Sequence, residues 1–270
     1  MGTIEENRQL WNTSYNWPMN GEEWSNEWGD AETQWFGAIL PRIWAFVPTG
    51  TILEIAPGFG RWTTYLRKQC NQMILVDLSE NCINACQERF CHDAHLRYHI
   101  NDGISLAMLD DNSLDFVFRF DSLVHAEAEV IKTYLAQLAV KLSRNGVGFL
   151  HHSNLGAFQQ AFELIDRIPA ELRDLVVDNW FKSDRHWRAP SMTAALFETY
   201  CNAAGLDCIN QELINWKRNG ILIDCFSLFT PRGSVWSRPN QTVENTNFMQ
   251  EAQLLKCLAQ MYSTRSFPVH

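Results

Sequence analysis

The sequence lacks an excess of positive charge, and it lacks any long apolar run. Its 270 residues contain 22 Lys and Arg against 31 Asp and Glu, a formal net charge of −9. Nucleic-acid and anionic-membrane binders usually present a basic surface, so we expect neither partner. No run reaches the ~18 apolar residues that cross a bilayer, and the polar residues 1–20 lack the features of an export signal. We therefore expect a cytoplasmic protein that acts on a small molecule.

The eight cysteines lack the paired spacing of a metal knuckle. The tightest group is Cys82, Cys86, Cys91 and His92, and it contains no CxxC pair. Structural zinc usually takes ligands in such closely spaced pairs. In a long chain without an export signal, cysteines are typically reduced thiols that pack as small hydrophobic residues. We therefore expect neither a disulfide framework nor a zinc site.

Internal repeats are also absent, so the fold is inferred from alternating strand and helix patterns. Apolar residues make up 46% of the chain, enough for a sizeable core. Short apolar runs occur at 51–56, 73–77, 96–100, 114–120 and 147–152, and helical patterns at 61–69, 80–90 and 130–141. This alternation is typical of βαβ units and of a parallel sheet buried on both faces. The prediction is an α/β, doubly wound, mostly parallel sheet.

Two segments outside this alternation are predicted to be helical. Residues 1–48 contain six tryptophans among helix-breaking prolines and glycines, which indicates a helical N-terminal cap. Its tryptophans serve either as packing anchors or as a lid over a substrate. Residues 155–190 form a second candidate lid, a charged insertion after the fifth strand with helices at 158–167 and 170–180.

The alternation resumes after the insertion. The expected elements are a helix at 193–204, strands at 207–216 and 221–230, and a final helix at 244–262. Asn219 and Gly220 stand between the two strands, and this pair favours a tight hairpin because both residues tolerate positive φ. The last strand should therefore be antiparallel. The main domain is predicted to span 49–230, and 231–270 to form a tail.

A glycine-rich turn follows the first predicted strand. Residues 52–63 are ILEIAPGFGRWT, and Gly58 and Gly60 let the backbone approach a ligand while the following helix points its N-terminus toward it. The second strand ends at Asp77, 23 residues after Glu54. An acidic side chain at that place can accept hydrogen bonds from both hydroxyls of a ribose. The two features together predict a nucleoside-containing cofactor.

Over about residues 50–230 these features resemble the Rossmann-like, class I S-adenosylmethionine-dependent methyltransferases. The resemblance implies a seven-stranded sheet with an antiparallel last strand, S-adenosylmethionine as cofactor and S-adenosylhomocysteine as product. Ala56 replaces the family's usual first glycine, a departure that also argues against the GxGxxG fingerprint of an NAD-dependent oxidoreductase. The implied cofactor-binding residues are Glu54, Ala56, Pro57, Gly58, Gly60, Asp77, Leu78, Asn101, Asp102, Gly103 and Phe120. Among them, Asp77 resembles the family's ribose ligand and Asp102 its adenine ligand.

Candidate catalytic residues follow the fourth and fifth strands. Methyl transfer to a hydroxyl needs a base, and parallel strands bring their carboxyl ends to one edge of the sheet. Asp121 and His125 follow the fourth strand, and His151 and His152 end the fifth. Only one of His151 and His152 can point to a given face, because side chains alternate along a strand. Which histidine is the base stays open, with Asp121 orienting it or binding the acceptor.

Further residues are predicted to bind the substrate. They are Trp28, Asn154, Trp187 and Arg188, from the cap, the fifth strand and the insertion. A divalent ion such as Mg²⁺, held by Asp121 and one histidine, is an alternative way to bind two sugar hydroxyls. Only one carboxylate is evident there, so we expect no metal.

The acceptor is predicted from the polar and aromatic residues around these strand ends. Together with the glycine turn, FDSLVH at 120–125 and HHSN at 151–154 resemble bacterial methyltransferases of sugars and glycans. A sugar offers hydroxyls for hydrogen bonds and a CH face for aromatic rings, so O-methylation of a sugar is preferred. The alternatives are N- or O-methylation of an aromatic or alkaloid-like natural product, and a protein that binds S-adenosylmethionine or S-adenosylhomocysteine without turnover. The oligomeric state is left open, with a homodimer as one option.

Overall fold

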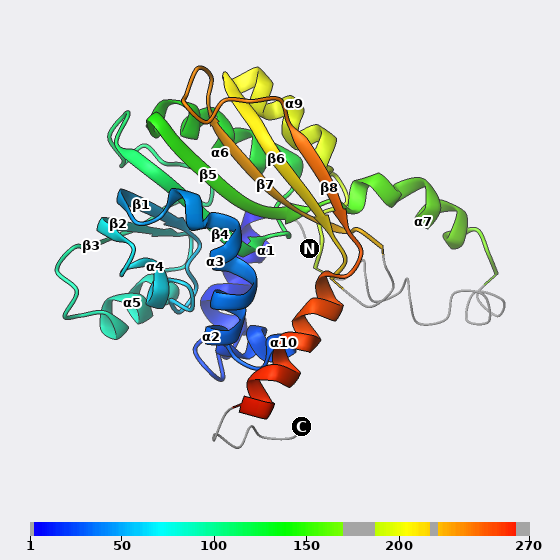
Figure 1. The fold of residues 1–270 in the computed structure, drawn as a ribbon, viewed down its shortest axis with the longest axis horizontal. Coiled ribbons are helices and arrows are strands. Elements are labelled where there is room, and N and C mark those ends of the chain that lie inside the picture. Colours follow the sequence, from blue (N-terminus) through cyan, green and yellow to red (C-terminus); the bar gives the residue numbers. More distant parts are fainter. Residues whose placement is uncertain (1–2, 170–186, 217–220, 263–270) are drawn as a thin grey trace.

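A computed structural model describes residues 3–169, 187–216 and 221–262 (Figure 1). Their centre is one sheet with the strand order β3-β2-β1-β4-β5-β7-β6-β8. The strands are β1 (Thr49–Ile55), β2 (Cys70–Asp77), β3 (Leu96–Ile100), β4 (Leu114–Leu123), β5 (Leu142–Ser153), β6 (Leu206–Ile214), β7 (Asp224–Pro231) and β8 (Gln241–Asn245). Strands β1 to β5 pair in parallel, while β7 is antiparallel to both β5 and β6. The predicted mostly parallel α/β fold with an antiparallel strand is confirmed.

Helices cover both faces of the sheet. On one face α6 (Ala128–Lys141) and α9 (Ala194–Ala204) lie together (Figure 1). The other face is covered by α4 (Thr63–Leu66), α5 (Glu80–Arg89) and N-terminal segments. Phe116, Val117 and Phe118 of β4 are all fully buried; Val117 packs in one core, and Phe116 and Phe118 in the other. The continuous apolar runs of the sequence are therefore explained by burial from both sides.

The eighth strand was not predicted. Strand β8 pairs in parallel with β6 at the edge of the sheet, and four of its five residues are exposed. A polar, solvent-facing edge strand has no apolar run to reveal it in the sequence. The predicted turn at Asn219 and Gly220 lies outside the described residues.

The N-terminal residues form short helices, some of which pack in the core and some beside α5. In chain order these are α1 (Ile4–Gln9), η1 (Leu10–Ser14), η2 (Glu22–Trp28), α2 (Ala31–Gln34), η3 (Trp35–Ile39), α3 (Leu40–Ile43) and η4 (Trp44–Phe46). Trp28 and Trp35 are buried in the core, and the Trp28 ring lies 5.8 Å from Phe248 of α10 (Phe248–Tyr262). Residues 10–14 instead lie against α5, where the Asn12 side chain accepts hydrogen bonds from Ser79 Oγ and the Asn81 amide, both at 3.1 Å.

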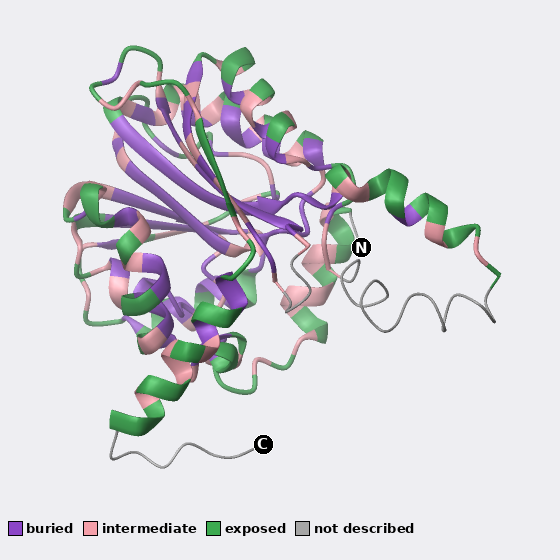
Figure 2. Ribbon diagram, turned by 45° about the vertical axis from the view of Figure 1, so that its right-hand side comes forward, coloured by how far each residue is buried: buried purple, intermediate pink, exposed green. Residues whose placement is uncertain are grey.

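The insertion after β5 is described only at its two ends. It begins with η5 (Leu155–Phe158) and α7 (Gln159–Asp166), and α7 projects from the body with Phe162 as its buried residue (Figure 2). The helix predicted at 170–180 lies outside the described residues. Among the helices of the described ranges, none is long and apolar enough to span a membrane.

Candidate active site

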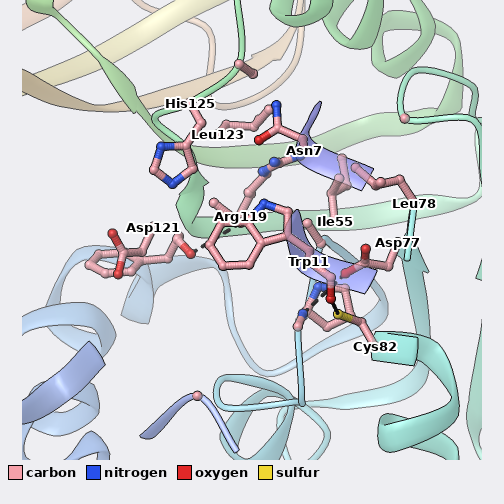
Figure 3. A pocket seen from close by; sticks show the side chains of 18 of the residues that line it. Asn7, Trp11, Ile55, Asp77, Leu78, Cys82, Arg119, Asp121, Leu123 and His125 are labelled. Carbon is pink, nitrogen blue, oxygen red and sulfur yellow. Dashed lines mark hydrogen bonds between the residues drawn. The ribbon is translucent and has the colours of Figure 1, made fainter. Parts of the chain in front are cut away.

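A cleft opens at the carboxyl ends of β1, β2 and β4 (Figure 3). Its floor comes from the glycine turn and these strand ends, and its cover from residues 4–24. Trp187 and Arg188, which follow the insertion, complete the wall beside His125. The carboxyl ends of a doubly wound sheet are where such folds bind ligands, so this cleft is the candidate active site.

The glycine turn has three residues in the left-handed region. Ala56, Gly58 and Gly60 have φ values of 53°, 56° and 83°. At Gly58 a Cβ would lie 2.8 Å from the Trp17 indole, so only glycine fits beneath this ring. Ala56 and Gly58 line the cleft, together with Pro57 between them. Gly60 lies behind them, facing Phe90 and Cys86.

Glu54 lies behind the turn and does not line the cleft. Its side chain is fully buried and accepts a 2.5 Å hydrogen bond from Thr63 Oγ1. Burial raises the pKa of Glu54 to about 8, although the Thr63 hydroxyl opposes the shift. The protonated carboxyl therefore joins β1 to α4 at neutral pH.

Glu54→Gln is expected to remove a pH dependence of stability. The unfolded chain releases the Glu54 proton near its ordinary pKa of 4.5, but the folded protein keeps it up to about pH 8. The free energy of unfolding of the wild type therefore falls as pH rises through this window, by about 2 kcal/mol between about pH 6 and pH 8. Denaturant titrations of the wild type and the variant at several pH values measure the difference between their free energies of unfolding. Contributions of the other titratable groups cancel in that difference. Parallel pH curves for the two proteins would contradict the assignment.

Asp77 ends β2 inside the cleft. Its two carboxylate oxygens accept hydrogen bonds from the Gly58 amide at 3.3 Å and the Ser79 amide at 2.9 Å. Burial raises the pKa of Asp77 to about 6, and the two amides oppose that shift. Above that pH, each oxygen keeps lone pairs for further donors. Leu78 lines the cleft beside it.

The end of β3 contributes Asn101 and Gly103 to the cleft, but not Asp102. Asn101 Oδ1 accepts a 2.9 Å hydrogen bond from the Gly103 amide, and Asn101 Nδ2 donates to Tyr134 Oη at 3.3 Å. Asp102 is exposed and accepts hydrogen bonds from the amides of Ile104 and Ser105, which hold its pKa below the usual range. Its carboxylate therefore stabilises the turn after β3.

His125 and Asp121 lie together in the wall of the cleft (Figure 3). His125 Nδ1 makes a short hydrogen bond to the Trp187 carbonyl oxygen. Burial lowers the pKa of His125 to about 4, with a further decrease from the nearby Arg188. Asp121 forms a 3.2 Å ion pair with Arg61, and Phe120 also lines the cleft.

His151 and His152 are fully buried and point to opposite faces of β5, as the alternation predicts. The His152 ring stacks on Phe197 at 4.5 Å, and its Nε2 lies 2.8 Å from Ser227 Oγ. Burial lowers the pKa of His152 to about 4. His151 packs against Phe120 with ring centroids 4.9 Å apart. Neither histidine lines the cleft, so the structure separates both from His125.

Of the four predicted substrate-binding residues, two line the cleft and two do not. Trp187 and Arg188 line the cleft. Trp28 lies in the core, and Asn154 is buried between loops, where it donates to the Leu222 carbonyl and accepts from the Ala194 amide. In the described part of the chain, no three His, Cys, Asp or Glu side chains form a possible metal site.

Sequence analysis missed two arginines of the cleft. Arg61 follows the glycine turn, pairs with Asp121 and lies 4.4 Å from the Trp62 ring centroid. Arg119 is buried within β4, and its Nε has no hydrogen-bond partner among the described residues. Burial lowers the pKa of Arg119 to about 10. A charged residue inside the apolar run 114–120 was the available signal for Arg119.

Residues of the N-terminal segment were missed as well. Asn7, Trp11, Trp17 and Trp24 line the cleft, and Trp17 stacks on Phe59 with centroids 4.5 Å apart. The Trp11 ring lies in the middle of the cleft (Figure 3), 6.0 Å from His125. The tryptophan-rich composition of residues 1–48 was the signal, but it does not distinguish these rings from the buried Trp28 and Trp35.

Trp17→Ala is expected to speed exchange of ligands with the cleft. Trp17 covers Gly58, so its removal should raise both the association and dissociation rates of S-adenosylhomocysteine, the latter by about 10-fold. Stopped-flow fluorescence of the remaining tryptophans measures both rates. Trp44→Ala is the matched control, because Trp44 is 67% exposed and outside the cleft. Equal rates in the two variants would contradict a covering role.

Part of the chain that lines this cleft is similar to known proteins. Residues 52–146, which contain the glycine turn, Asp77 and His125, match the family model of a methyltransferase domain. These residues are therefore similar to a methyltransferase domain. A curated relative, phosphoethanolamine N-methyltransferase 1 of Caenorhabditis elegans, is 26% identical over 102 residues. That match covers 38% of this chain and spans 21% of the relative's length.

Solved structures share the fold of the methyltransferase domain. A Pyrococcus horikoshii OT3 protein, PH0226, superposes with a TM-score of 0.55 at 16% identity, covering 83% of this chain and 96% of its own. Magnesium protoporphyrin IX methyltransferase of Synechocystis PCC 6803, with bound S-adenosylhomocysteine, superposes with a TM-score of 0.56 at 13% identity. The match covers 84% of this chain and 99% of that protein. These likenesses show that the chain shares the α/β fold of these structures.

Proposed function

We propose that the protein transfers a methyl group from S-adenosylmethionine to a hydroxyl of a sugar or glycan, with His125 as the general base. The observation that carries the proposal is the placement of His125 in the wall of the cleft, with Nδ1 bound to the Trp187 carbonyl oxygen. The cofactor supplies an electrophilic methyl group bonded to a sulfonium. The chain must bind the acceptor, exclude water and remove its proton.

The cofactor half of the cleft is assigned to the glycine turn and the ends of β2 and β3. Asp77 would accept hydrogen bonds from the ribose hydroxyls, because its oxygens lie in the cleft and are ionised above about pH 6. Asn101 and Gly103 would contact the adenine, and the left-handed turn at Ala56 to Gly58 leaves space for the methionine end. Asp102 is exposed outside the cleft, so we assign it to the turn instead.

The hydrogen bond of His125 determines where its ring can accept a proton. A carbonyl oxygen only accepts, so Nδ1 carries the ring hydrogen and Nε2 carries a lone pair. The lowered pKa keeps the ring neutral above about pH 4. When the hydroxyl oxygen attacks the methyl group, its proton would pass to Nε2.

The acceptor half combines charged groups with aromatic rings. Asp121 and Arg188 offer an acceptor and donors for hydroxyls, and both line the cleft. Trp11 and Trp187 lie 6.0 and 5.6 Å from His125, ring to ring, and give flat apolar surfaces for the CH face of a sugar. These rings also favour a second candidate, an aromatic natural product methylated on oxygen or nitrogen.

A methyl-transfer screen tests the proposal. The purified protein is incubated with S-adenosylmethionine and either hydroxyl-rich glycosides or planar phenols and amines, and release of S-adenosylhomocysteine is measured. We expect turnover with glycosides. Turnover confined to phenols or amines would replace the first candidate by the second. Tight cofactor binding with no turnover on either set would instead favour a binding protein.

A further inference from the structure

Asp121 has a backbone conformation that is uncommon for residues with a Cβ. Its φ is 65°, in the left-handed region, at a shift in the pairing of β4 with β5. Residues with a Cβ adopt this conformation rarely and keep it where their surroundings hold it. The Asp121 amide donates a 3.1 Å hydrogen bond to His151 Nδ1, and the Asp121 carboxylate pairs with Arg61. A fully buried histidine therefore contacts the backbone of a charged residue in the cleft wall.

The same hydrogen bond determines the tautomer of His151. Nδ1 accepts from an amide, so it carries no hydrogen, and the ring hydrogen is on Nε2. Nε2 lies 3.4 Å from the Asp224 carboxylate, which is fully buried on β7. Arg188 donates to both oxygens of Asp224, at 3.0 and 2.6 Å. The His151 ring thus lies between Asp121 and Asp224, the carboxylate that binds Arg188.

The surroundings of His151 keep it from the acceptor. Phe120, Phe226 and Trp216 pack around its ring with centroids 4.8 to 5.1 Å away, and the ring has no exposed surface. Nδ1 accepts from the Asp121 amide, and Nε2 lies beside the Asp224 carboxylate without a hydrogen bond among the described residues. His151 therefore acts on the cleft only through the residues that it holds.

We propose that His151 is a positioning residue that holds Asp121 and, through Asp224, Arg188 at the acceptor end of the cleft. The inference rests on the proposed function, since it assigns these two charged side chains to acceptor binding. One buried ring thus accepts a hydrogen bond from Asp121 of β4 and lies 3.4 Å from Asp224 of β7, which binds Arg188.

Two variants separate the two contacts. The side-chain amide of His151→Asn reaches the position of Nδ1 and can still accept from Asp121, whereas His151→Gln reaches the position of Nε2 and loses that contact. His152→Asn is the matched control, because His152 is the adjacent, equally buried histidine on the opposite face. Thermal unfolding establishes which variants fold.

The first measurement needs no acceptor. In the wild type, long-range ¹H–¹⁵N spectra of the histidine rings should show His151 protonated on Nε2 alone. Hydrogen exchange of the Asp121 amide should be slow in the wild type, His151→Asn and His152→Asn, and about 10-fold or more faster in His151→Gln. A ring proton on Nδ1, or slow Asp121 exchange in a folded His151→Gln variant, would overturn the proposal. If His151→Gln does not fold, the ring spectrum of the wild type still decides.

The second measurement uses an acceptor found in the methyl-transfer screen. His151→Gln should lower kcat/KM for the acceptor by about 10-fold while leaving the dissociation constant of S-adenosylhomocysteine unchanged. His151→Asn should recover part of this loss. Failure of the screen would reject the proposed function and leave the spectroscopic result to decide the geometry. An acceptor kcat/KM that His151→Gln leaves unchanged would overturn the positioning role while the proposed function stands.

Discussion

His125→Ala is expected to lower turnover by ~100-fold or more while the affinity for S-adenosylmethionine stays nearly unchanged. The substitution removes the Nε2 lone pair that is proposed to take the acceptor proton. Cofactor affinity should persist, because Asp77, Asn101 and the glycine turn do not contact this ring. Steady-state kinetics with the identified acceptor and calorimetric titration with S-adenosylhomocysteine measure the two quantities. Equal losses in both would contradict the role of His125 as base.

His125→Asn is the matched control. Its amide nitrogen can replace Nδ1 as donor to the Trp187 carbonyl, but nothing replaces Nε2. We expect this variant to be as inactive as the alanine variant. Recovered activity would mean that His125 acts by holding the segment at Trp187.

The pH profile of the wild type gives an independent check. Since burial lowers the pKa of His125 to about 4, the base is neutral above that pH and protonated below it. In a plot of kcat/KM for the acceptor against pH, deprotonation of His125 should therefore appear as a rise centred at about pH 4. This lies below the ordinary range of histidine. A limb near pH 6.5 that disappears in His125→Asn would contradict the environment described for this ring.

Asp77→Ala is expected to raise the dissociation constant of S-adenosylhomocysteine by about 100-fold. Hydrogen bonds to a charged group contribute roughly 1.5–3 kcal/mol each, and two ribose hydroxyls would lose their acceptor. The Gly58 and Ser79 amides would also lose their acceptor, which loosens the turn. Calorimetric titration measures the change. A dissociation constant within a few-fold of the wild type would reject Asp77 as the ribose ligand.

Asp77→Asn is the control that keeps the shape of the side chain. Because the pKa of Asp77 is raised to about 6, the wild type should bind S-adenosylhomocysteine more weakly as pH falls through 6 and the carboxylate is protonated. The asparagine variant has no such group, so its weaker affinity should not change over the same range. An equal pH response in both proteins would assign the titration to another group.

The sheet was predictable because its signals are local. Strands β1, β2 and β4 are apolar runs that are each followed by a helix, and the glycine turn and Asp77 lie at the ends of adjacent strands, β1 and β2. The exposed strand β8 lacked such a run, and nothing near it in the sequence indicates its pairing with β6.

The candidate site was predictable only as a set of strand ends. Alternation along β5 placed His151 and His152 on opposite faces, but it could not assign either face to the cleft. The shift in pairing between β4 and β5 and the packing of Phe120 and Phe197 determine that both rings are covered.

The sequence by itself therefore determined the order of strands and helices along the core, the glycine turn, and Asp77 at the end of β2. These features depend on neighbouring residues and on the spacing of apolar residues. Only the tertiary structure decided which histidine borders the cleft. It also brought together Arg61 and Asp121, 60 residues apart, and Arg188 and Asp224, 36 apart. Such contacts arise when separate elements pack and buried charges require partners, and no local pattern in the sequence specifies them.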